Sequence, residues 1–184
     1  MAIIYTTADG KAYATEDETL LILLESTPPV RFITDRTWDD VKRWRELHDK
    51  GWAAMTASEQ SEWTGEMKGR YTHNDMNRVE NAVAELSGQF VDKGYLITPL
   101  TTKTDWNLWS VPTKTDMTRY LGNVATLRSL VTVYPTTPEA PTVDHRLDYE
   151  RANDIEKILV DLYDILEKTP QSWFYSGEIY SGEV

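Results

Sequence analysis

Apolar residues recur at helical spacing along most of the chain from residue 37 onward. The clearest run is Met76, Val79, Val83, Leu86 and Phe90, whose steps of three and four place all five side chains on one helix face. This pattern predicts a helix over residues 73–93, ended by Gly94. Similar spacing predicts further helices over residues 38–50, 57–68, 114–131 and 147–168.

Four threonines, each followed three residues later by an acid, stand where these helices are expected to begin. They are Thr37, Thr56, Thr72 and Thr113, with Asp40, Glu59, Asp75 and Asp116 as the acids. A threonine oxygen accepts from the free backbone N–H groups at a helix start, and an acid at the third position reaches back to the cap residue. The reach of Asp is shorter than that of Glu. We therefore expect one helix to begin after each of these threonines.

Residues 1–36 lack this period and are predicted to form an extended N-terminal arm. Residues 3–7 and 11–14 favour strands on either side of the Asp9-Gly10 turn signal, which indicates a short β-hairpin. Residues 20–24 are an apolar cluster, and Pro28-Pro29 would stop any helix. The arm carries more apolar residues than a small bundle needs, so we expect it to pack on its own bundle or on a neighbouring subunit.

The C-terminal tail contains a tandem repeat, in which Tyr175-Ser176-Gly177-Glu178 returns as Tyr180-Ser181-Gly182-Glu183. With a two-residue period, Tyr175, Gly177 and Ile179 would share one face, so the first unit could add as a strand to another chain. An ordinary frayed terminus is the alternative. The candidate partner contacts at the two ends are Ile3, Ile4, Leu20, Leu21, Leu23, Leu24, Tyr175, Ile179 and Tyr180.

The expected fold class is therefore mainly α. It comprises an arm over residues 1–36, a bundle of four to five helices over residues 37–170 and a short tail over residues 171–184. Two long connections, residues 95–112 and 133–146, show no regular pattern, and the second is rich in proline.

The first of these connections carries Trp106 and Trp109. On an exposed loop the two rings could stack on the sugar rings of a cell wall. They could equally plug the open end of the bundle, as large apolar residues usually do.

Two sequence phrases occur twice. Thr72, Asp75 and Arg78 are matched in type and spacing by Thr113, Asp116 and Arg119. Asn77 and Glu80, with apolar positions around them, are matched by Asn153 and Glu156. Both duplication and convergent ways of starting and burying a helix explain this echo.

Composition and motif searches give no sign of catalysis. Thirty acidic residues against nineteen basic residues give a formal net charge of −11, which disfavours binding to nucleic acid. The absence of cysteine excludes disulfides and thiolate chemistry. The histidines lack metal-ligand spacing, and a solvated helix face accounts for the acids in residues 59–66 better than the paired carboxylates of a glycosidase. We predict no enzyme activity, no catalytic or metal-binding residues and no cofactor.

Several short motifs in residues 35–184 are similar to motifs of a known group of proteins. They are Asp35-Arg36-Thr37 with Asp40-Val41, Gly51-Trp52, Glu62-Trp63, Tyr71 with Asp75-Met76-Asn77-Arg78-Val79, Lys103-Thr104-Asp105-Trp106, and Trp173-Phe174-Tyr175-Ser176-Gly177-Glu178. Together they resemble small structural proteins from the tail or baseplate regions of phages and prophages of Gram-positive, Clostridia-like bacteria. The resemblance carries no catalytic signature.

The resemblance implies a non-enzymatic structural or adaptor component that contacts other phage-like structural proteins or copies of itself. The alternative is a carbohydrate-binding module that uses Trp106 and Trp109. The N-terminus lacks signal-peptide features and no apolar run is long enough to span a bilayer. We therefore expect synthesis in the bacterial cytoplasm, no membrane insertion and incorporation in a phage-like particle.

Overall fold

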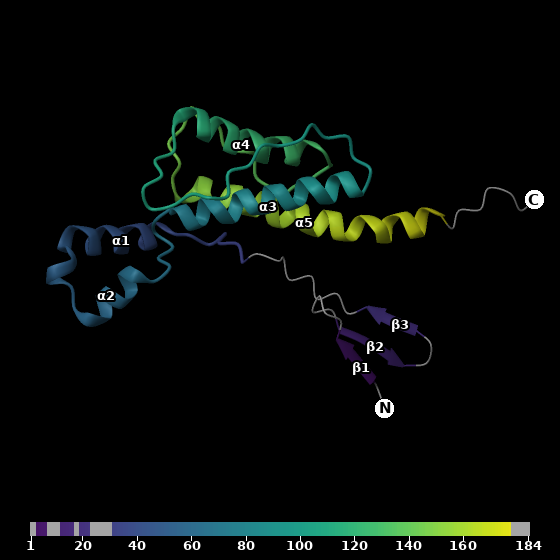
Figure 1. Ribbon diagram of the computed structural model, residues 1–184, viewed down its shortest axis with the longest axis horizontal. Helices are drawn as coiled ribbons and strands as arrows, with labels where there is room; N and C mark the ends of the chain where they lie inside the picture. The colour runs from purple at the N-terminus through teal and green to yellow at the C-terminus, as the bar shows by residue number, and fades with distance from the viewer. Residues whose placement is uncertain (1–2, 7–11, 17–18, 23–30, 178–184) are drawn as a thin grey trace, which may run out of the picture.

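The computed structural model describes residues 3–6, 12–16, 19–22 and 31–177, with side chains for residues 31–169 (Figure 1). The helices in this part of the chain are α1 (Trp38–Lys50), α2 (Ala57–Thr64), α3 (His73–Asp92), α4 (Lys114–Ser129) and α5 (Tyr149–Gly177). A short 3₁₀ turn, η1 (Trp52–Ala54), links α1 to α2. The mainly helical fold predicted from the sequence is confirmed.

The N-terminal strands form one antiparallel sheet in the order β1-β2-β3, made of β1 (Ile3–Thr6), β2 (Ala12–Glu16) and β3 (Thr19–Ile22). The first two strands are the expected hairpin, with Tyr5 opposite Tyr13. The third strand was not predicted as a strand, and it places Ile22 opposite Tyr13. The turn expected at Asp9-Gly10 lies outside the described residues.

All four threonine caps are present. The hydroxyls of Thr37, Thr56, Thr72 and Thr113 accept from the backbone N–H three residues on, at 3.2, 3.3, 3.5 and 3.2 Å respectively. In return, the acid at that position accepts from the N–H of its threonine at 2.6–2.9 Å. Three of these acids are Asp, so the shorter side chain closes a full capping box as well as Glu does.

The predicted helix ends are correct for α1 and within a residue for α3. Gly94 has φ +84°, a left-handed conformation that favours glycine. Its N–H donates to Val91, and the N–H of Tyr95 donates to Phe90, which is the Schellman pattern. The rings of Tyr95 and Phe90 meet edge to face with centroids 5.1 Å apart, which supplies the apolar contact common at this motif.

Three other predicted ends need correction. α2 ends at Thr64 rather than residue 68, because no apolar face holds it longer: it has no buried residue, and the Gly65 N–H closes the last turn on Ser61 and Glu62. α4 ends at Ser129, two residues short of the predicted end at residue 131. α5 continues past Pro170 to Gly177, where an end at residue 168 was predicted. One proline removes one hydrogen bond but does not oblige the flanking residues to leave helical dihedrals.

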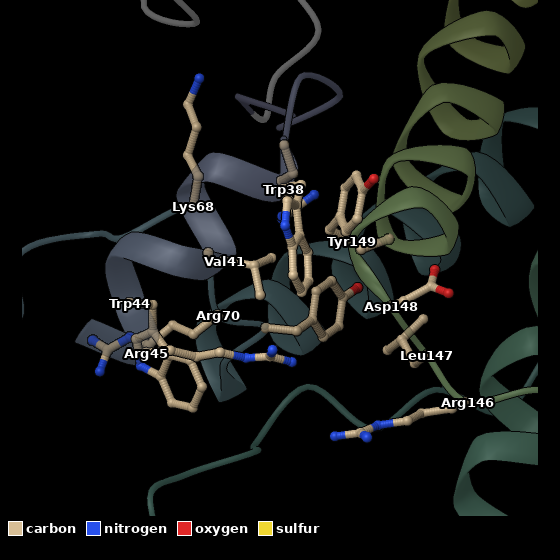
Figure 2. A pocket seen from close by; sticks show the side chains of 14 residues that line it. Trp38, Val41, Trp44, Arg45, Lys68, Arg70, Arg146, Leu147, Asp148 and Tyr149 are labelled. Atoms are coloured by element: carbon tan, nitrogen blue, oxygen red, sulfur yellow. The ribbon is translucent and has the colours of Figure 1, made fainter. Parts of the chain in front are cut away.

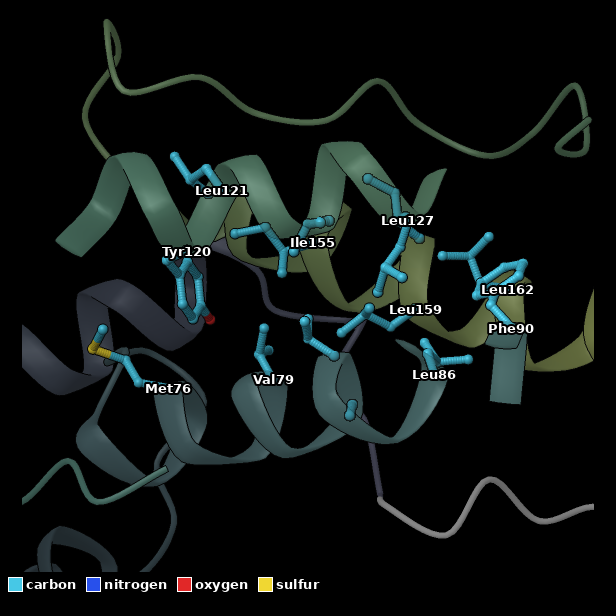
Figure 3. Packing of buried hydrophobic residues seen from close by; sticks show 14 of the residues in the cluster. Met76, Val79, Leu86, Phe90, Tyr120, Leu121, Leu127, Ile155, Leu159 and Leu162 are labelled. Carbon is cyan, nitrogen blue, oxygen red and sulfur yellow. The ribbon is translucent and has the colours of Figure 1, made fainter. Parts of the chain in front are cut away.

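The hydrophobic core lies between α3, α4 and α5 (Figure 3). All five residues of the predicted α3 seam are buried, with 0–6% of their surface exposed. Figure 3 shows Tyr120 and Leu127 of α4 facing this seam, with Leu159 of α5 filling the space between them. The large apolar residues of α5 that are fully buried are Ile155, Ile158, Leu159, Leu162 and Leu166. The apolar seam of α3 therefore packs against both α4 and α5.

The hairpin formed by α1, η1 and α2 lies beside the start of α3 (Figure 1) and buries fewer apolar residues than the bundle. Its buried apolar residues are Leu47 and Met55, whereas Trp44 and Trp63 stack on each other half-buried at 6.5 Å. Gly69 fits this hairpin to the chain leading into α3, since a Cβ there would lie 2.0 Å from the carbonyl oxygen of Asp40. Only glycine allows that approach.

Candidate functional site

The predicted contact residues at the two chain ends are only partly described. Leu23, Leu24, Ile179 and Tyr180 lie outside the described residues. Ile3, Ile4, Leu20 and Leu21 lie in the N-terminal sheet.

Tyr175 belongs to α5. The two-residue period proposed for Tyr175 and Gly177 is therefore wrong, because their backbone is helical and places residues two apart on different sides.

The two loop tryptophans do not form a joint platform. Trp106 is buried in the core, with 4% of its surface exposed, and Lys103 Nζ sits 4.5 Å from the centre of its ring. Trp109 is 90% exposed. Trp106 thus fills the bundle, as one of the two interpretations held, and a sugar could reach only Trp109.

A well-ordered turn presents Trp109. The Asn107 side chain accepts from the N–H of Trp109 at 2.9 Å, and the Ser110 hydroxyl accepts from the N–H of Asn107 at 3.1 Å. A backbone bond from Ser110 N–H to Asn107 closes the turn at 3.0 Å. Leu108 and Val111, on either side, are 82% and 83% exposed. We call Leu108, Trp109 and Val111 the apolar loop patch, since large apolar side chains held out in this way are typical of interaction sites.

A buried ionic cluster ties the segment before α1 to the bundle. Arg36 donates to Asp75 at 2.9 Å and to Glu156 at 2.7 Å, and both its own side chain and that of Glu156 are almost completely buried. Arg78 donates through Nε and Nη2 to the two oxygens of Glu156, at 3.1 and 2.9 Å, and also contacts Asp75. The N–H of Ile33 donates to Glu156 at 2.6 Å.

The surroundings of this cluster shift the pKa values of two of its members, Asp75 and Arg78. Burial raises the pKa of Asp75, but the hydrogen bonds from Thr72 and the neighbouring Arg78 outweigh it, so the pKa lies below its ordinary value. Burial lowers the pKa of Arg78, yet Glu156 and Asp75 raise it further, and the net shift is upward. The cluster is therefore a structural ion network that joins α3, α5 and the segment before α1.

The repeated sequence phrases correspond to repeated contacts. The Asn77 side chain donates to the carbonyl of Trp106 and accepts from its N–H, both at 2.9 Å. The Asn153 side chain makes the same pair with Arg36, at 2.8 and 3.0 Å. We call these two contacts the asparagine clamps.

The acids that follow the clamps also behave alike. Arg78 pairs with Glu156 of α5, and Arg119 pairs with Glu80 of α3 at 2.5 Å. The echo in the sequence thus marks two equivalent joints, each made of a clamp and an arginine–glutamate pair.

The helix-two acids are unsuited to hydrolysis. Lys50 and the Thr56 backbone lower the pKa of Glu59 to about 2, and Arg43 lowers the pKa of Glu62. A general acid needs a raised pKa, so these carboxylates cannot supply one. The described residues contain no group of His, Cys, Asp and Glu that could hold a metal ion. None of the described helices is long and apolar enough to cross a membrane.

A cleft of about 470 Å³ lies between the α1 hairpin and the start of α5 (Figure 2). Trp38 and Val41 line it from α1, and Leu147 and Tyr149 line it from the opposite side. The rings of Trp38 and Tyr149 meet with centroids 6.4 Å apart. We call it the aromatic–basic cleft.

Its remaining lining residues are mostly basic or aromatic. They are Arg36, Trp44, Arg45, Lys68, Gly69, Arg70, Tyr71, Arg146, Asp148 and Ala152.

This cleft is basic on a strongly acidic protein. Five bases line it against one acid, Asp148, which pairs with Arg151. The ionic cluster neutralises Arg36, and Asp35 pairs with Lys68. Three arginines, Arg45, Arg70 and Arg146, have no carboxylate partner among the described side chains, and Arg70 Nε is a buried donor without an acceptor there. Sequence reasoning missed this site because its three arginines are dispersed along the chain and only folding gathers them.

Comparison with known proteins gives no relative: no family model, no curated protein and no solved structure matches this chain.

Proposed function

We propose that the protein is a non-enzymatic structural or adaptor component of a phage-like tail or baseplate, and that it works through protein–protein contacts. The observation that carries this proposal is the apolar loop patch. Leu108, Trp109 and Val111 are each at least 82% exposed, although the turn that bears them is fixed by three hydrogen bonds. Preorganised aromatic and aliphatic side chains are the usual anchors of protein interfaces.

The chemistry of the described residues supports the same proposal. The charged side chains that are buried pair with one another, and the exposed acids of α2 are held ionised by neighbouring bases. The sequence phrases that resemble tail proteins fall on structural joints. Asp75 and Arg78 belong to the ionic cluster, and Asn77 forms a clamp. Such residues build a subunit rather than an active site.

The test uses the full-length chain and the purified products of the genes beside its own. Binding is measured by interferometry for the wild type, for Trp109→Ser, and for Trp52→Ser as a matched control. Trp52 is also exposed, at 52%, but belongs to η1 rather than to the loop of Trp109. We expect at least one neighbouring structural protein to bind, and Trp109→Ser to weaken it by about tenfold or more.

Two results would count against the proposal. If no neighbouring structural protein binds the wild type, the structural role is wrong. A saturable change in tryptophan fluorescence on titration with cell-wall fragments, lost in Trp109→Ser, would instead establish the carbohydrate-binding alternative.

A further inference from the structure

The basic and aromatic residues of the aromatic–basic cleft are complementary to the acidic and aromatic residues of a repeated segment of this same chain. We propose that the cleft binds the Tyr-Ser-Gly-Glu repeat, residues 175–183, of a second copy of this protein. The proposal rests on the structural role proposed above, but it concerns a different surface and names the partner as a second copy.

Charge complementarity selects this occupant. The cleft offers three guanidinium groups that lack a carboxylate partner among the described side chains, those of Arg45, Arg70 and Arg146, around an apolar floor. Two of them lie over tryptophan rings, Arg45 over Trp38 at 5.0 Å and Arg70 over Trp63 at 5.7 Å, which leaves their N–H donors available to an acid. Residues 171–184 contain two acids, Glu178 and Glu183, and no base. Arginine binds carboxylates through paired N–H donors, so each glutamate suits one such group.

The aromatic content matches as well. Each repeat unit begins with a tyrosine, and the cleft carries Trp38, Trp44 and Tyr149. Rings that are partly exposed in the free subunit would gain apolar contact and edge-to-face partners from Tyr175 and Tyr180. Trp38 is 44% exposed and is the largest such surface in the cleft.

Distance requires that the tail comes from another copy. α5 begins at Tyr149, in the wall of the cleft, and leads away from it through 29 residues. At 1.5 Å per residue this helix is about 42 Å long, and Figure 1 shows its C-terminal end on the opposite side of the molecule from α1 and α2. The six residues from Gly177 to Glu183 reach back at most about 21 Å. The repeat of one chain therefore cannot enter its own cleft.

A tail that enters the cleft of the next copy makes a head-to-tail contact. The two contacting surfaces differ, so each bound subunit still has a free cleft at one end and a free repeat at the other. Contacts of this kind generate rings when the rotation closes and filaments when it does not. Both are arrangements expected of a subunit in a repeating particle.

The decisive experiment is a charge exchange in the full-length chain, measured by sedimentation velocity over a range of concentrations. We expect the wild type to associate, more strongly at low salt. The cleft variant Arg45→Glu/Arg146→Glu and the tail variant Glu178→Lys/Glu183→Lys should each weaken association by about tenfold or more. All four substitutions in one chain should restore association, because the charges are then complementary again.

A control separates local pairing from net charge. Lys42→Glu/Lys114→Glu changes the total charge as much as the cleft variant does, at two exposed lysines that do not line the cleft, and should associate like the wild type. In addition, a peptide of residues 175–184 contains no tryptophan, so its binding can be followed through the tryptophan fluorescence of the protein, to which Trp38 and Trp44 in the cleft contribute. The same peptide with both glutamates replaced by glutamine should bind more weakly.

The proposal is overturned if the wild type stays monomeric at every concentration, or if the fourfold exchange fails to restore association lost in both double variants. Neither result bears on the binding of a different protein through Trp109, so the proposed structural role is tested independently of the cleft.

Discussion

The α1–α2 hairpin and the bundle of α3, α4 and α5 share one way of starting helices, since threonine caps begin α1 and α2 as well as α3 and α4, yet the two parts are held together differently. The bundle buries sixteen apolar residues in one cluster and joins its parts with buried arginine–glutamate pairs. The hairpin buries Leu47 and Met55 and otherwise relies on stacked rings and exposed ion pairs. Caps therefore fix where helices begin, whereas burial decides how firmly they are held.

The position of the aromatic–basic cleft follows from this contrast. One wall belongs to the weakly buried hairpin and the other to the bundle. Because the hairpin buries fewer apolar residues than the bundle, we expect local opening to cost less free energy on the hairpin side of the cleft. Four predictions test the contrast, and the largest expected effect comes first.

Glu156→Gln should cost about 3–5 kcal/mol of unfolding free energy, because it leaves Arg36 and Arg78 buried without their shared anion. Urea denaturation of the full chain measures the loss. Glu150→Gln is the control on the same helix, where the side chain is exposed and little should change. A loss below about 1 kcal/mol at Glu156 would mean that the cluster does not hold the bundle.

Leu86→Ala should cost about 2–5 kcal/mol, since the side chain is fully buried in the α3 seam. Leu47→Ala removes an equally buried leucine from the hairpin. Hydrogen exchange should then show faster exchange in α1 and α2 with the bundle amides unaffected. Global unfolding of equal cost in both variants would show that hairpin and bundle form one cooperative unit, which contradicts the contrast drawn here.

Acid should weaken the bundle through Asp75. Its pKa in the folded protein lies below the ordinary value, so its stabilising effect is complete above about pH 4 and is lost as the pH falls through the lowered folded value. Unfolding free energies measured from about pH 6 to about pH 2 should fall more steeply for the wild type than for Asp75→Asn. Identical slopes would mean that Asp75 is not charged and paired in the folded protein.

Thr72→Ala and Thr113→Ala should each destabilise the protein by about 1 kcal/mol, because each removes the hydroxyl that caps a bundle helix. Thr56→Ala, in the hairpin, should affect chiefly the exchange of the α2 amides. Thr104→Ala is the control, since it caps no helix. Unchanged denaturation midpoints for Thr72→Ala and Thr113→Ala would show that the caps contribute nothing.

Features that depend on near neighbours in the sequence could be predicted. The caps, the α3 seam and the Gly94 stop all depend on residues within a turn or two of one another, and all are present. The predicted end of α2 at residue 68 is wrong because the helix already ends at Thr64, where Gly65 caps it. The predicted end of α5 at residue 168 is wrong because the helix continues through Pro170 to Gly177.

Features that depend on distant residues could not be predicted. Arg36 meets Glu156 across 120 positions, and nothing in either local sequence announces the pair. The cleft likewise gathers Arg45, Arg70 and Arg146 from three separate segments. The long-range contacts that did have a sequence signal were the two joints, because the same residue types recur at the same spacing in both.

The asparagine clamps have a consequence for how such a protein can change over time. A side-chain amide that pairs with the N–H and the C=O of one residue makes no contact that depends on that residue's side chain. The two clamped residues, Arg36 and Trp106, accordingly have very different side chains. The backbone path of each connecting segment therefore does not depend on which side chains the segment exposes. Mutations can replace the exposed side chains of Leu108, Trp109 and Val111 while Asn77 keeps the loop attached at the same point.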